Sequence, residues 1–228
     1  MDQIALLRTV PLFSELKEQK LRALSEAANF HRYPKNSMIV LAQEEGNTLF
    51  IISKGRVKVS IQSEDGREIV LSILGAGEFF GEMSLLDGRP RSATVVALED
   101  TEALVLRRAD FLRLIERFPQ ISIRLLEELT TRLRKTDRKI ESLALMDVTG
   151  RIVSTLLQLA EDEGIQGVEG ILIRNRPTHQ MLANMSGTTR ETVSRTLKRL
   201  ENEGYIACTS RDCLILREQD LRRDFLSS

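Results

Sequence analysis

The stretch Ser186-Gly187-Thr188-Thr189-Arg190-Glu191-Thr192-Val193-Ser194-Arg195 decides how the C-terminal part of this chain folds. We expect a turn at residues 186–188 between a helix over 178–185 and a second, basic helix over 189–203. Short strands are expected near 171–173, 205–209 and 213–216. Two helices around a glycine-containing turn, followed by a hairpin, predict a winged helix-turn-helix.

Charge is concentrated around this motif. The whole chain has a formal net charge of zero, but residues 174–199 hold six arginines and lysines against one glutamate, a net charge of +5. A local basic stripe is what a DNA-binding face needs. A solvated helix face would also explain the charge, and a winged helix that binds protein is a second alternative.

The second helix would place its N-terminal side chains at the base edges in the major groove of DNA. Near that end Arg190, Glu191, Ser194 and Arg195 share an exposed face. Arginine can bond guanine O6 and N7, and glutamate can accept from cytosine N4. Other residues could bond phosphate, which positions the protein without reading sequence. The further candidates for DNA contact are Thr178, Gln180, Thr188, Thr189, Lys198 and Arg199.

A second motif, Gly81-Glu82-Met83-Ser84-Leu85-Leu86-Asp87-Gly88-Arg89-Pro90-Arg91-Ser92-Ala93, has the parts of a phosphate-and-ribose pocket. The backbone of Gly81, Glu82, Met83 and Ser84 can offer N–H groups from a short helical turn to an anion. Arg91 would add a charged, planar donor and Ser92 a hydroxyl. Ionised Glu82 only accepts hydrogen bonds, which suits a ribose 2′-hydroxyl. A simple ion pair between Glu82 and Arg91 is the alternative.

The region around the second motif has the pattern of short strands. From about residue 37 to 107, alternation such as Val57, Val59 and Ile61 between polar residues predicts strands, with a hairpin turn at Asp65-Gly66. Regularly spaced glycines suit a compact β-roll or jelly-roll. Ahead of it, residues 14–29 are expected to form a helix capped by Ser14.

After residue 107 the helical period returns. Pro119 can begin a helix, and no glycine or proline follows until Gly150. Residues spaced 3, 4, 3, 4 and 3 apart form a coiled-coil pattern, which we call the seam: Leu126, Leu129, Leu133, Thr136, Ile140 and Leu143. Such a seam favours a parallel homodimer. Packing of this helix on its own domain is the alternative. A boundary near Asp147-Val148-Thr149-Gly150 precedes another amphipathic helix over 151–163.

Composition limits the class of protein. At 228 residues, 42% of them hydrophobic, the chain can hold two domains with their own cores. It has no signal-like start and no apolar run of 18 residues, so we expect neither secretion nor a membrane span. Cys208 and Cys213 are too few for a disulfide framework; we expect them to be buried strand residues in a reducing cytoplasm. With His31 and His179 as its histidines and no HExxH, Walker or nucleophile-elbow motif, the chain is not expected to be an enzyme or a metal protein.

The second motif resembles the phosphate-binding cassette of the cyclic AMP receptor protein and fumarate-nitrate regulator family, and the resemblance covers essentially the whole chain. It implies an α+β protein: a cyclic-nucleotide-binding β-roll over 1–117, a dimerisation helix and hinge over 118–147, and a winged helix-turn-helix over 148–228. By that resemblance Glu82 would bind ribose, while Gly81, Arg91 and Ser92 would bind the cyclic phosphate.

The same resemblance assigns partners. Thr136, the polar residue of the seam, would reach the purine of cyclic AMP, although a device that fixes helix register is the alternative. The Arg-Glu-x-x-x-Arg pattern of Arg190, Glu191 and Arg195 implies a transcription regulator that binds double-stranded DNA at inverted TGTGA-like half-sites. RNA polymerase is a further partner that the family implies.

Two departures from the family pattern, at Asp137 and at Gln43-Glu44, bear on the ligand site. Asp137 stands where the family's cyclic AMP receptor has a serine, and a carboxylate could accept from guanine N1–H and N2–H₂. The alternatives to cyclic AMP are therefore cyclic GMP, cyclic di-GMP or no ligand at all. Gln43-Glu44 replaces the usual Gly-Glu, with Gly46 displaced. Ser194 is typical of the fumarate-nitrate regulator branch, whereas Arg190 favours the cyclic AMP receptor branch.

Overall fold

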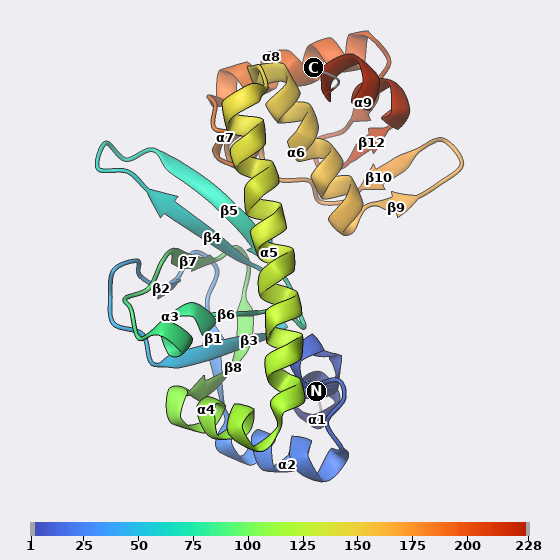
Figure 1. Ribbon diagram of the computed structural model, residues 1–228. Helices are drawn as coiled ribbons and strands as arrows, with labels where there is room; N and C mark the ends of the chain where they lie inside the picture. Colours follow the sequence, from blue (N-terminus) through green and yellow to red (C-terminus); the bar gives the residue numbers. More distant parts are fainter. Residues whose placement is uncertain (1–2, 227–228) are drawn as a thin grey trace. The chain divides into compact units, whose positions relative to one another are not determined.

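The computed structural model describes residues 3–226 and divides the chain into two compact units. Of the described residues, the first unit comprises 3–63 and 70–133, and the second comprises 64–69 and 134–226. A single long helix, α5 (Pro119–Leu145), begins in the first unit and ends in the second (Figure 1). Within residues 3–226 no helix combines the length and apolar character needed to span a membrane.

The first unit begins with helices that pack on one another. Helix α1 (Gln3–Thr9), a 3₁₀ turn (Pro11–Phe13) and α2 (Glu18–Ala27) bury Leu7, Phe13 and Leu21. The expected helix over 14–29 with a Ser14 cap was wrong, because the helix starts at Glu18 and Ser14 donates its hydroxyl to the Pro11 carbonyl. The 3₁₀ turn directs Phe13 and Leu16 into the core, which the helical spacing of the leucines does not reveal.

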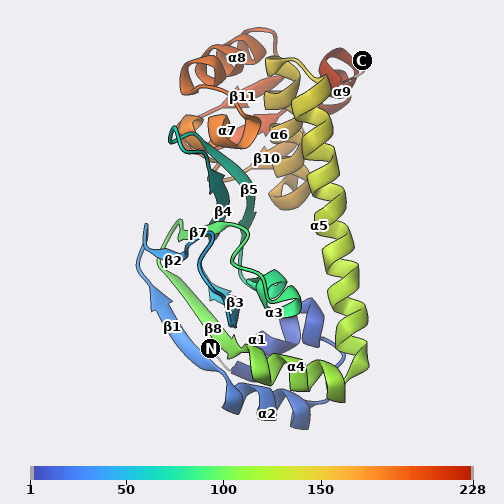
Figure 2. The same ribbon diagram turned by 60° about the vertical axis from the view of Figure 1, so that its left-hand side comes forward.

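Two antiparallel four-stranded sheets form the roll, in the orders β1-β8-β3-β6 and β2-β7-β4-β5. Figure 2 shows α1, α2 and α4 (Arg108–Arg117) gathered at one end of these strands. The strands are β1 (Asn29–Tyr33), β2 (Met38–Val40), β3 (Thr48–Lys54), β4 (Val57–Gln62), β5 (Glu68–Leu74), β6 (Phe79–Phe80), β7 (Thr94–Ala97) and β8 (Thr101–Arg107). This arrangement confirms the expected α+β class with a β-roll.

Strand β3 is buried on both of its faces. Its side chains alternate between two apolar clusters: Leu49 and Ile51 face the helices, while Phe50 and Ile52 face the other sheet. A strand buried on both faces reads as a continuous apolar run instead of an alternating one. The phenyl rings of Phe50 and Phe80 stack with centroids 4.8 Å apart in the second cluster. Short helix α3 (Glu82–Asp87) follows β6 directly.

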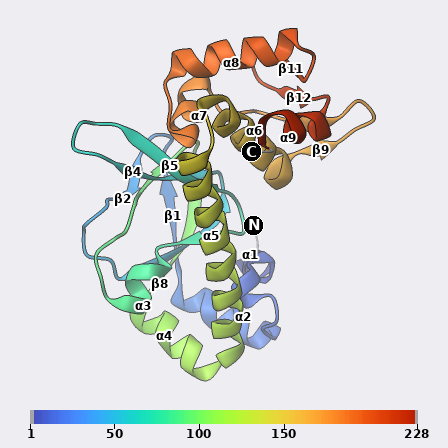
Figure 3. The ribbon, with the colours of Figure 1, turned by 45° about the horizontal axis from the view of Figure 1, so that its top comes forward.

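The second unit has the elements of a winged helix-turn-helix. Its first helix, α6 (Val148–Glu163), begins at Asp147, whose Oδ1 accepts from Gly150 N at 2.7 Å. Figure 3 shows α7 (His179–Ser186) leading into α8 (Arg190–Asn202). The antiparallel sheet has the order β11-β12-β10-β9, with β9 (Ile165–Gln166), β10 (Ile171–Ile173), β11 (Ile206–Cys208) and β12 (Cys213–Ile215). A last helix, α9 (Glu218–Leu226), was not expected from sequence.

Helix α5 leaves much of the seam uncovered within the chain. Leu126, Leu133 and Ile140 are 60–63% exposed, while Leu129 is partly buried against the first-unit core. Its other apolar side, with Ile121 and Leu125, packs into that core. The helix therefore has two apolar faces, of which the chain buries only one.

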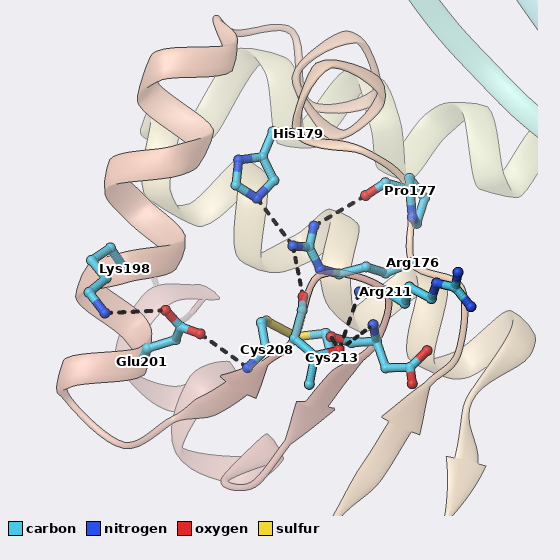
Figure 4. The surroundings of a disulfide bond; sticks show 10 residues. Arg176, Pro177, His179, Lys198, Glu201, Cys208, Arg211 and Cys213 are labelled. Atoms are coloured by element: carbon cyan, nitrogen blue, oxygen red, sulfur yellow. Dashed lines mark hydrogen bonds and ion pairs between the residues drawn. A yellow bond between two sulfur atoms is a disulfide. The ribbon is translucent and has the colours of Figure 1, made fainter.

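The two cysteines form a pair that the sequence analysis did not anticipate. Both lie in the wing strands as expected, but strand register places Cys208 directly opposite Cys213, and a disulfide joins them (Figure 4). Their Cα atoms are 4.2 Å apart. Counting cysteines could not show this, because only the register of β11 on β12 brings the two residues together.

Candidate ligand pocket and DNA interface

Gly81 sets the geometry of the pocket motif. It has φ of +87°, a left-handed conformation, immediately before α3. A Cβ at this position would lie 2.8 Å from the Thr48 carbonyl oxygen and 2.6 Å from Arg91 Nη1. Both the backbone conformation and the close approach therefore require glycine.

Arg91 is buried and held by neutral groups. Its guanidinium donates from Nη1 to the Gly81 carbonyl at 2.9 Å and to Ser84 Oγ at 2.8 Å. From Nη2 it donates to the carbonyl and hydroxyl of Thr48, at 2.9 and 3.0 Å. Burial lowers the pKa of Arg91, and the charge of Glu82 opposes that effect. Arginine remains charged even so.

Glu82 pairs with a residue that the sequence analysis missed. Its carboxylate, 5% exposed, accepts from Arg132 Nη1 at 3.0 Å. Arg132 also donates to the Phe79 carbonyl at 2.7 Å and pairs with Glu128 at 3.0 Å. Among the described residues Glu82 and Arg91 form no ion pair, so that alternative is wrong. Arg132 lies one helical turn before Thr136 on α5, and this spacing is the signal that could have identified it.

The remaining pocket candidates lie in several environments. Ser84 is buried, whereas Met83 and Ser92 are exposed and touch through Ser92 Oγ and Met83 Sδ at 3.5 Å. Thr136 and Asp137 are exposed on α5, beyond residue 133 where the first unit ends. The first unit thus brings together Gly81, Glu82, Ser84 and Arg91, with Thr48 and Arg132 as additions.

The loop at Gln43-Glu44, which differs from the usual Gly-Glu, bonds the backbone of Arg91. Gln43 has φ of +70°, and the other described non-glycine residues with positive φ are both asparagines, which tolerate it. In this conformation Gln43 N donates to the Arg91 carbonyl, and Arg91 N donates to the Glu44 carbonyl, both at 2.8 Å. The loop therefore holds the backbone of Arg91 at the expense of a strained glutamine.

Replacing that glutamine is a direct test of the strain. We expect Gln43→Gly to stabilise the chain by about 0.5–1 kcal/mol, because glycine adopts this conformation without a Cβ clash. Chemical denaturation of the two proteins measures the difference. Gln43→Ala is the matched control, since it shortens the side chain but keeps the Cβ. Equal stabilisation by alanine would contradict this explanation.

The recognition segment is organised by helix caps. Thr178 Oγ1 accepts from Met181 N at 3.2 Å and caps α7, while Thr189 Oγ1 accepts from Thr192 N at 3.3 Å and caps α8. Gly187 has φ of +62° and ends α7. These caps place the helix boundaries one residue from the expected ones, within the normal uncertainty of helix ends.

Ser194 lies at the centre of a hydrogen-bond chain. Arg176 Nη2 contacts His179 Nε2 at 3.2 Å, and His179 Nδ1 contacts Ser194 Oγ at 2.7 Å. Arginine can only donate, so Nε2 accepts and the proton of a neutral imidazole is on Nδ1. Ser194 therefore accepts from His179 and donates to the Arg190 carbonyl at 3.0 Å. Neither Arg176 nor His179 was expected from the sequence to be a site residue.

This chain of bonds predicts a pH dependence. Burial lowers the pKa of His179 from 6.5, and Arg176 and Arg190 lower it further against a smaller effect of Glu201. As pH falls below about 6.5 the unfolded chain takes up a proton that the folded chain resists, so stability falls. We expect the melting temperature of the wild-type chain to drop more between pH 7.5 and 5.5 than that of His179→Gln. Parallel curves would contradict the assignment.

The charged candidates on α8 face outward. Arg190, Glu191, Arg195 and Lys198 are all exposed. Bonds from its own backbone and from Thr189 lower the pKa of Glu191, which therefore stays ionised. The other DNA candidates have partners within the unit or are partly buried. Gln180 donates to Asn184 Oδ1 at 2.9 Å, and Lys198 pairs with Glu201 at 3.9 Å. Arg199 donates to Thr149 Oγ1 at 3.3 Å, and Thr188 is half-buried. Within residues 3–226 no cluster of His, Cys, Asp and Glu could hold a metal ion.

Two family models match this chain. Residues 30–118 match a cyclic nucleotide-binding domain, and residues 150–224 match a Crp-like helix-turn-helix domain. The cAMP-activated global transcriptional regulator CRP of Pasteurella multocida is 38% identical over 189 residues, covering 82% of this chain and 90% of that protein.

Two solved structures share the architecture. The structure of a CooA mutant from Carboxydothermus hydrogenoformans has a TM-score of 0.83 at 28% identity, over 97% of this chain and 98% of that one. The c-di-GMP responsive global regulator CLP of Xanthomonas campestris has a TM-score of 0.75 at 27% identity, over 87% of this chain and 99% of that one.

Proposed function

Because this chain belongs to the cyclic AMP receptor protein and fumarate-nitrate regulator family of ligand-responsive transcription regulators, we propose that it is a homodimer that binds inverted TGTGA-like half-sites when cyclic AMP occupies its β-roll. RNA polymerase is its proposed partner at promoters, and the cytoplasm its proposed location. Regulators of this family are not enzymes.

The environment of Arg91 is the observation that carries the ligand proposal. A buried cation normally has a carboxylate partner, because burial of an unpaired charge is costly. Arg91 is 6% exposed, and every acceptor that the structure gives it is a carbonyl or a hydroxyl. A phosphate monoanion supplies the missing charge and matches a planar guanidinium.

Glu82 can bind the ribose, although one of its oxygens is already bonded to Arg132. Its Oε1 already accepts from Arg132 Nη1 at 3.0 Å, which fixes the position of the carboxylate. An ionised carboxylate can still accept from a 2′-hydroxyl through its remaining lone pairs. We propose that Arg132 orients Glu82 for this contact.

The residues that would select the purine base of the cyclic nucleotide are on α5. Thr136 and Asp137 are adjacent and exposed on it. The relative from Pasteurella multocida is named for activation by cAMP, whereas the regulator from Xanthomonas campestris is named for its response to c-di-GMP. We propose cyclic AMP with Thr136 at adenine; the acceptor Asp137 favours guanine nucleotides as the second candidate.

Titration calorimetry of the purified dimer with cyclic AMP, cyclic GMP and cyclic di-GMP, each followed by binding to a TGTGA palindrome, tests the proposal. Micromolar cyclic AMP binding that tightens DNA binding is the expected result. If only a guanine nucleotide binds, the ligand assignment is wrong and Asp137→Ser becomes the next variant. If no nucleotide binds, the chain is a regulator of the same fold with another signal or none.

For DNA control we propose two states of the dimer. Ligand must bind one arrangement of the seam more tightly than the other, since equal affinity for both would shift nothing. In the favoured arrangement the two α8 helices would reach successive major grooves, one helical turn of DNA apart.

Arg195 is the proposed reader of a base. It is exposed, and its one described side-chain contact is a 3.5 Å approach of Nη2 to Thr192 Oγ1. We expect Arg195→Ala to cost about 1–3 kcal/mol on the palindrome and to relax specificity at one base pair. Lys198→Ala is the control, with a uniform loss across sequences and a smaller salt dependence. A uniform loss for Arg195→Ala would show that it contacts only phosphate.

A further inference from the structure

We propose that Cys208 and Cys213 are a thiol–disulfide exchange site through which a dithiol reductant controls the recognition helix. They are the only two cysteines in the sequence. The inference rests on the proposed DNA binding for its consequence, but the exchange itself and its effect on α8 can be measured without DNA.

The disulfide closes the wing at the end of two very short strands. Strands β11 and β12 have three residues each, and Cys208 and Cys213 are their last and first residues, paired across the hairpin. The turn between them is held by Thr209 N donating to the Asp212 carbonyl at 2.9 Å and by Thr209 Oγ1 accepting from Arg211 N and Asp212 N. On its other side β12 pairs with β10, and the disulfide adds a covalent link at the turn end of the hairpin.

The turn is one end of a route to the DNA-reading face. Arg176 N donates to the Arg211 carbonyl at 2.7 Å, and Arg176 Nη2 approaches the Thr209 carbonyl at 3.4 Å. The same Nη2 bonds His179 (Figure 4). His179 in turn bonds Ser194 on α8. Three hydrogen bonds therefore connect the wing turn to the middle of the recognition helix.

The position of the Arg176 side chain depends strongly on these hydrogen bonds. Its Nε is a buried donor that has no hydrogen-bond acceptor in the described part of the chain, and burial lowers the pKa of the guanidinium. An unsatisfied buried donor makes the position of a side chain sensitive to its remaining bonds. Movement of the wing turn would therefore displace Arg176 and release His179.

A second route starts at the disulfide itself. Cys208 N donates to Glu201 Oε1 at 3.1 Å, and Glu201 Oε2 lies 3.9 Å from Lys198 Nζ. Glu201 and Lys198 are both on α8, and Lys198 is a candidate for phosphate contact. When the disulfide is reduced, the end of β11 can move and the Cys208 N–H can leave Glu201. The Glu201 carboxylate can then lie closer to Lys198 and screen its charge, which weakens attraction to DNA.

The exchange follows ordinary thiol chemistry. Cys213 is fully buried and Cys208 is half-buried, so a thiolate of the dithiol attacks Cys208 Sγ. The S–S bond breaks, Cys213 leaves with the electron pair and takes up a proton, and a mixed disulfide forms on Cys208. The second thiol of the reductant attacks that mixed disulfide and releases Cys208, which is also protonated. Two electrons and two protons pass to the protein, and the dithiol becomes a cyclic disulfide.

The test uses the full-length protein equilibrated with oxidised or reduced dithiothreitol. Alkylation with iodoacetamide and mass measurement counts free thiols, fluorescence anisotropy with the TGTGA palindrome measures DNA affinity, and hydrogen exchange reports on amides 190–199. We expect no free thiol in the oxidised protein and two in the reduced one. Reduction should weaken DNA binding about tenfold, the size of one charge-assisted contact, and speed exchange in α8.

Cys208→Ser is the matched variant, because it removes the disulfide and keeps the buried Cys213 thiol. It should behave like the reduced wild type in both buffers, which excludes a direct effect of the reductant. Free thiols in the oxidised protein would overturn the proposal, as would equal DNA affinity and equal exchange in the two redox states. If neither state binds DNA, the DNA-binding proposal fails, and the exchange rates of α8 alone decide whether the disulfide controls the helix.

Discussion

Arg91→Leu should reduce nucleotide affinity on the order of 100-fold or more, because it removes the buried positive charge and both ends of a planar donor. The leucine would also leave four acceptors without their donor, on Gly81, Ser84 and Thr48. A modest loss of stability in the roll is therefore expected as well. Titration calorimetry with cyclic AMP measures the affinity, and thermal unfolding measures the stability.

Arg89→Leu is the matched control for this variant. Arg89 is exposed two residues earlier in the same loop, and its backbone N bonds Asp87 while its position lies outside the cluster around Arg91. It should retain nucleotide affinity within a factor of about two, as surface substitutions usually do. Unchanged affinity in Arg91→Leu, with the chain folded, would rule out the proposed phosphate contact.

A charge on the seam should abolish the dimer. Leu133 and Ile140 are about 60% exposed and seven residues apart on one face of α5, so a parallel partner would place each against its own copy. We expect Leu133→Arg with Ile140→Arg to be monomeric at micromolar concentration. DNA affinity for the palindrome should fall about 10²–10⁴-fold, because the second half-site no longer binds as part of the same molecule. Sedimentation velocity and anisotropy measure the two effects.

Thr131→Arg controls for added charge on the same helix. Thr131 is exposed and lies off the seam, with its hydroxyl bonded to the Glu127 carbonyl at 3.0 Å. This variant should remain dimeric and keep its DNA affinity. A dimeric double variant would show that α5 packs elsewhere and that another surface joins the copies.

Local pattern was enough to predict most of the elements. The threonines at 178 and 189 cap helices close to the expected positions, Gly187 ends α7, and Asp65-Gly66 lies between β4 and β5. Predictions from the sequence were wrong where one residue type fits two local structures. Ser14 is a common cap residue, but the 3₁₀ turn before it uses its hydroxyl and delays the helix to Glu18.

In the pocket motif the sequence identified the charged residues but not the partners that they bond. The sequence identified Glu82 and Arg91 as a charged couple and left open an ion pair between them. The structure instead assigns Glu82 to Arg132, fifty residues away, and Arg91 to the carbonyl and hydroxyl groups of Thr48, Gly81 and Ser84. The spacing of Arg132 one turn before Thr136 could mark it as a candidate, but its pairing with Glu82 depends on how α5 is rotated against the roll.

From sequence alone came the family, the order of β-roll, long helix and winged helix-turn-helix, and the residue types suited to phosphate and to DNA. These follow from periodicity, turn residues and local charge, which act over a few residues along the chain. The tertiary structure alone decided that Cys208 faces Cys213, that His179 fixes Ser194, and that Arg132 holds Glu82. Each of these pairs depends on strand register or helix rotation, which only the packing of the whole core determines.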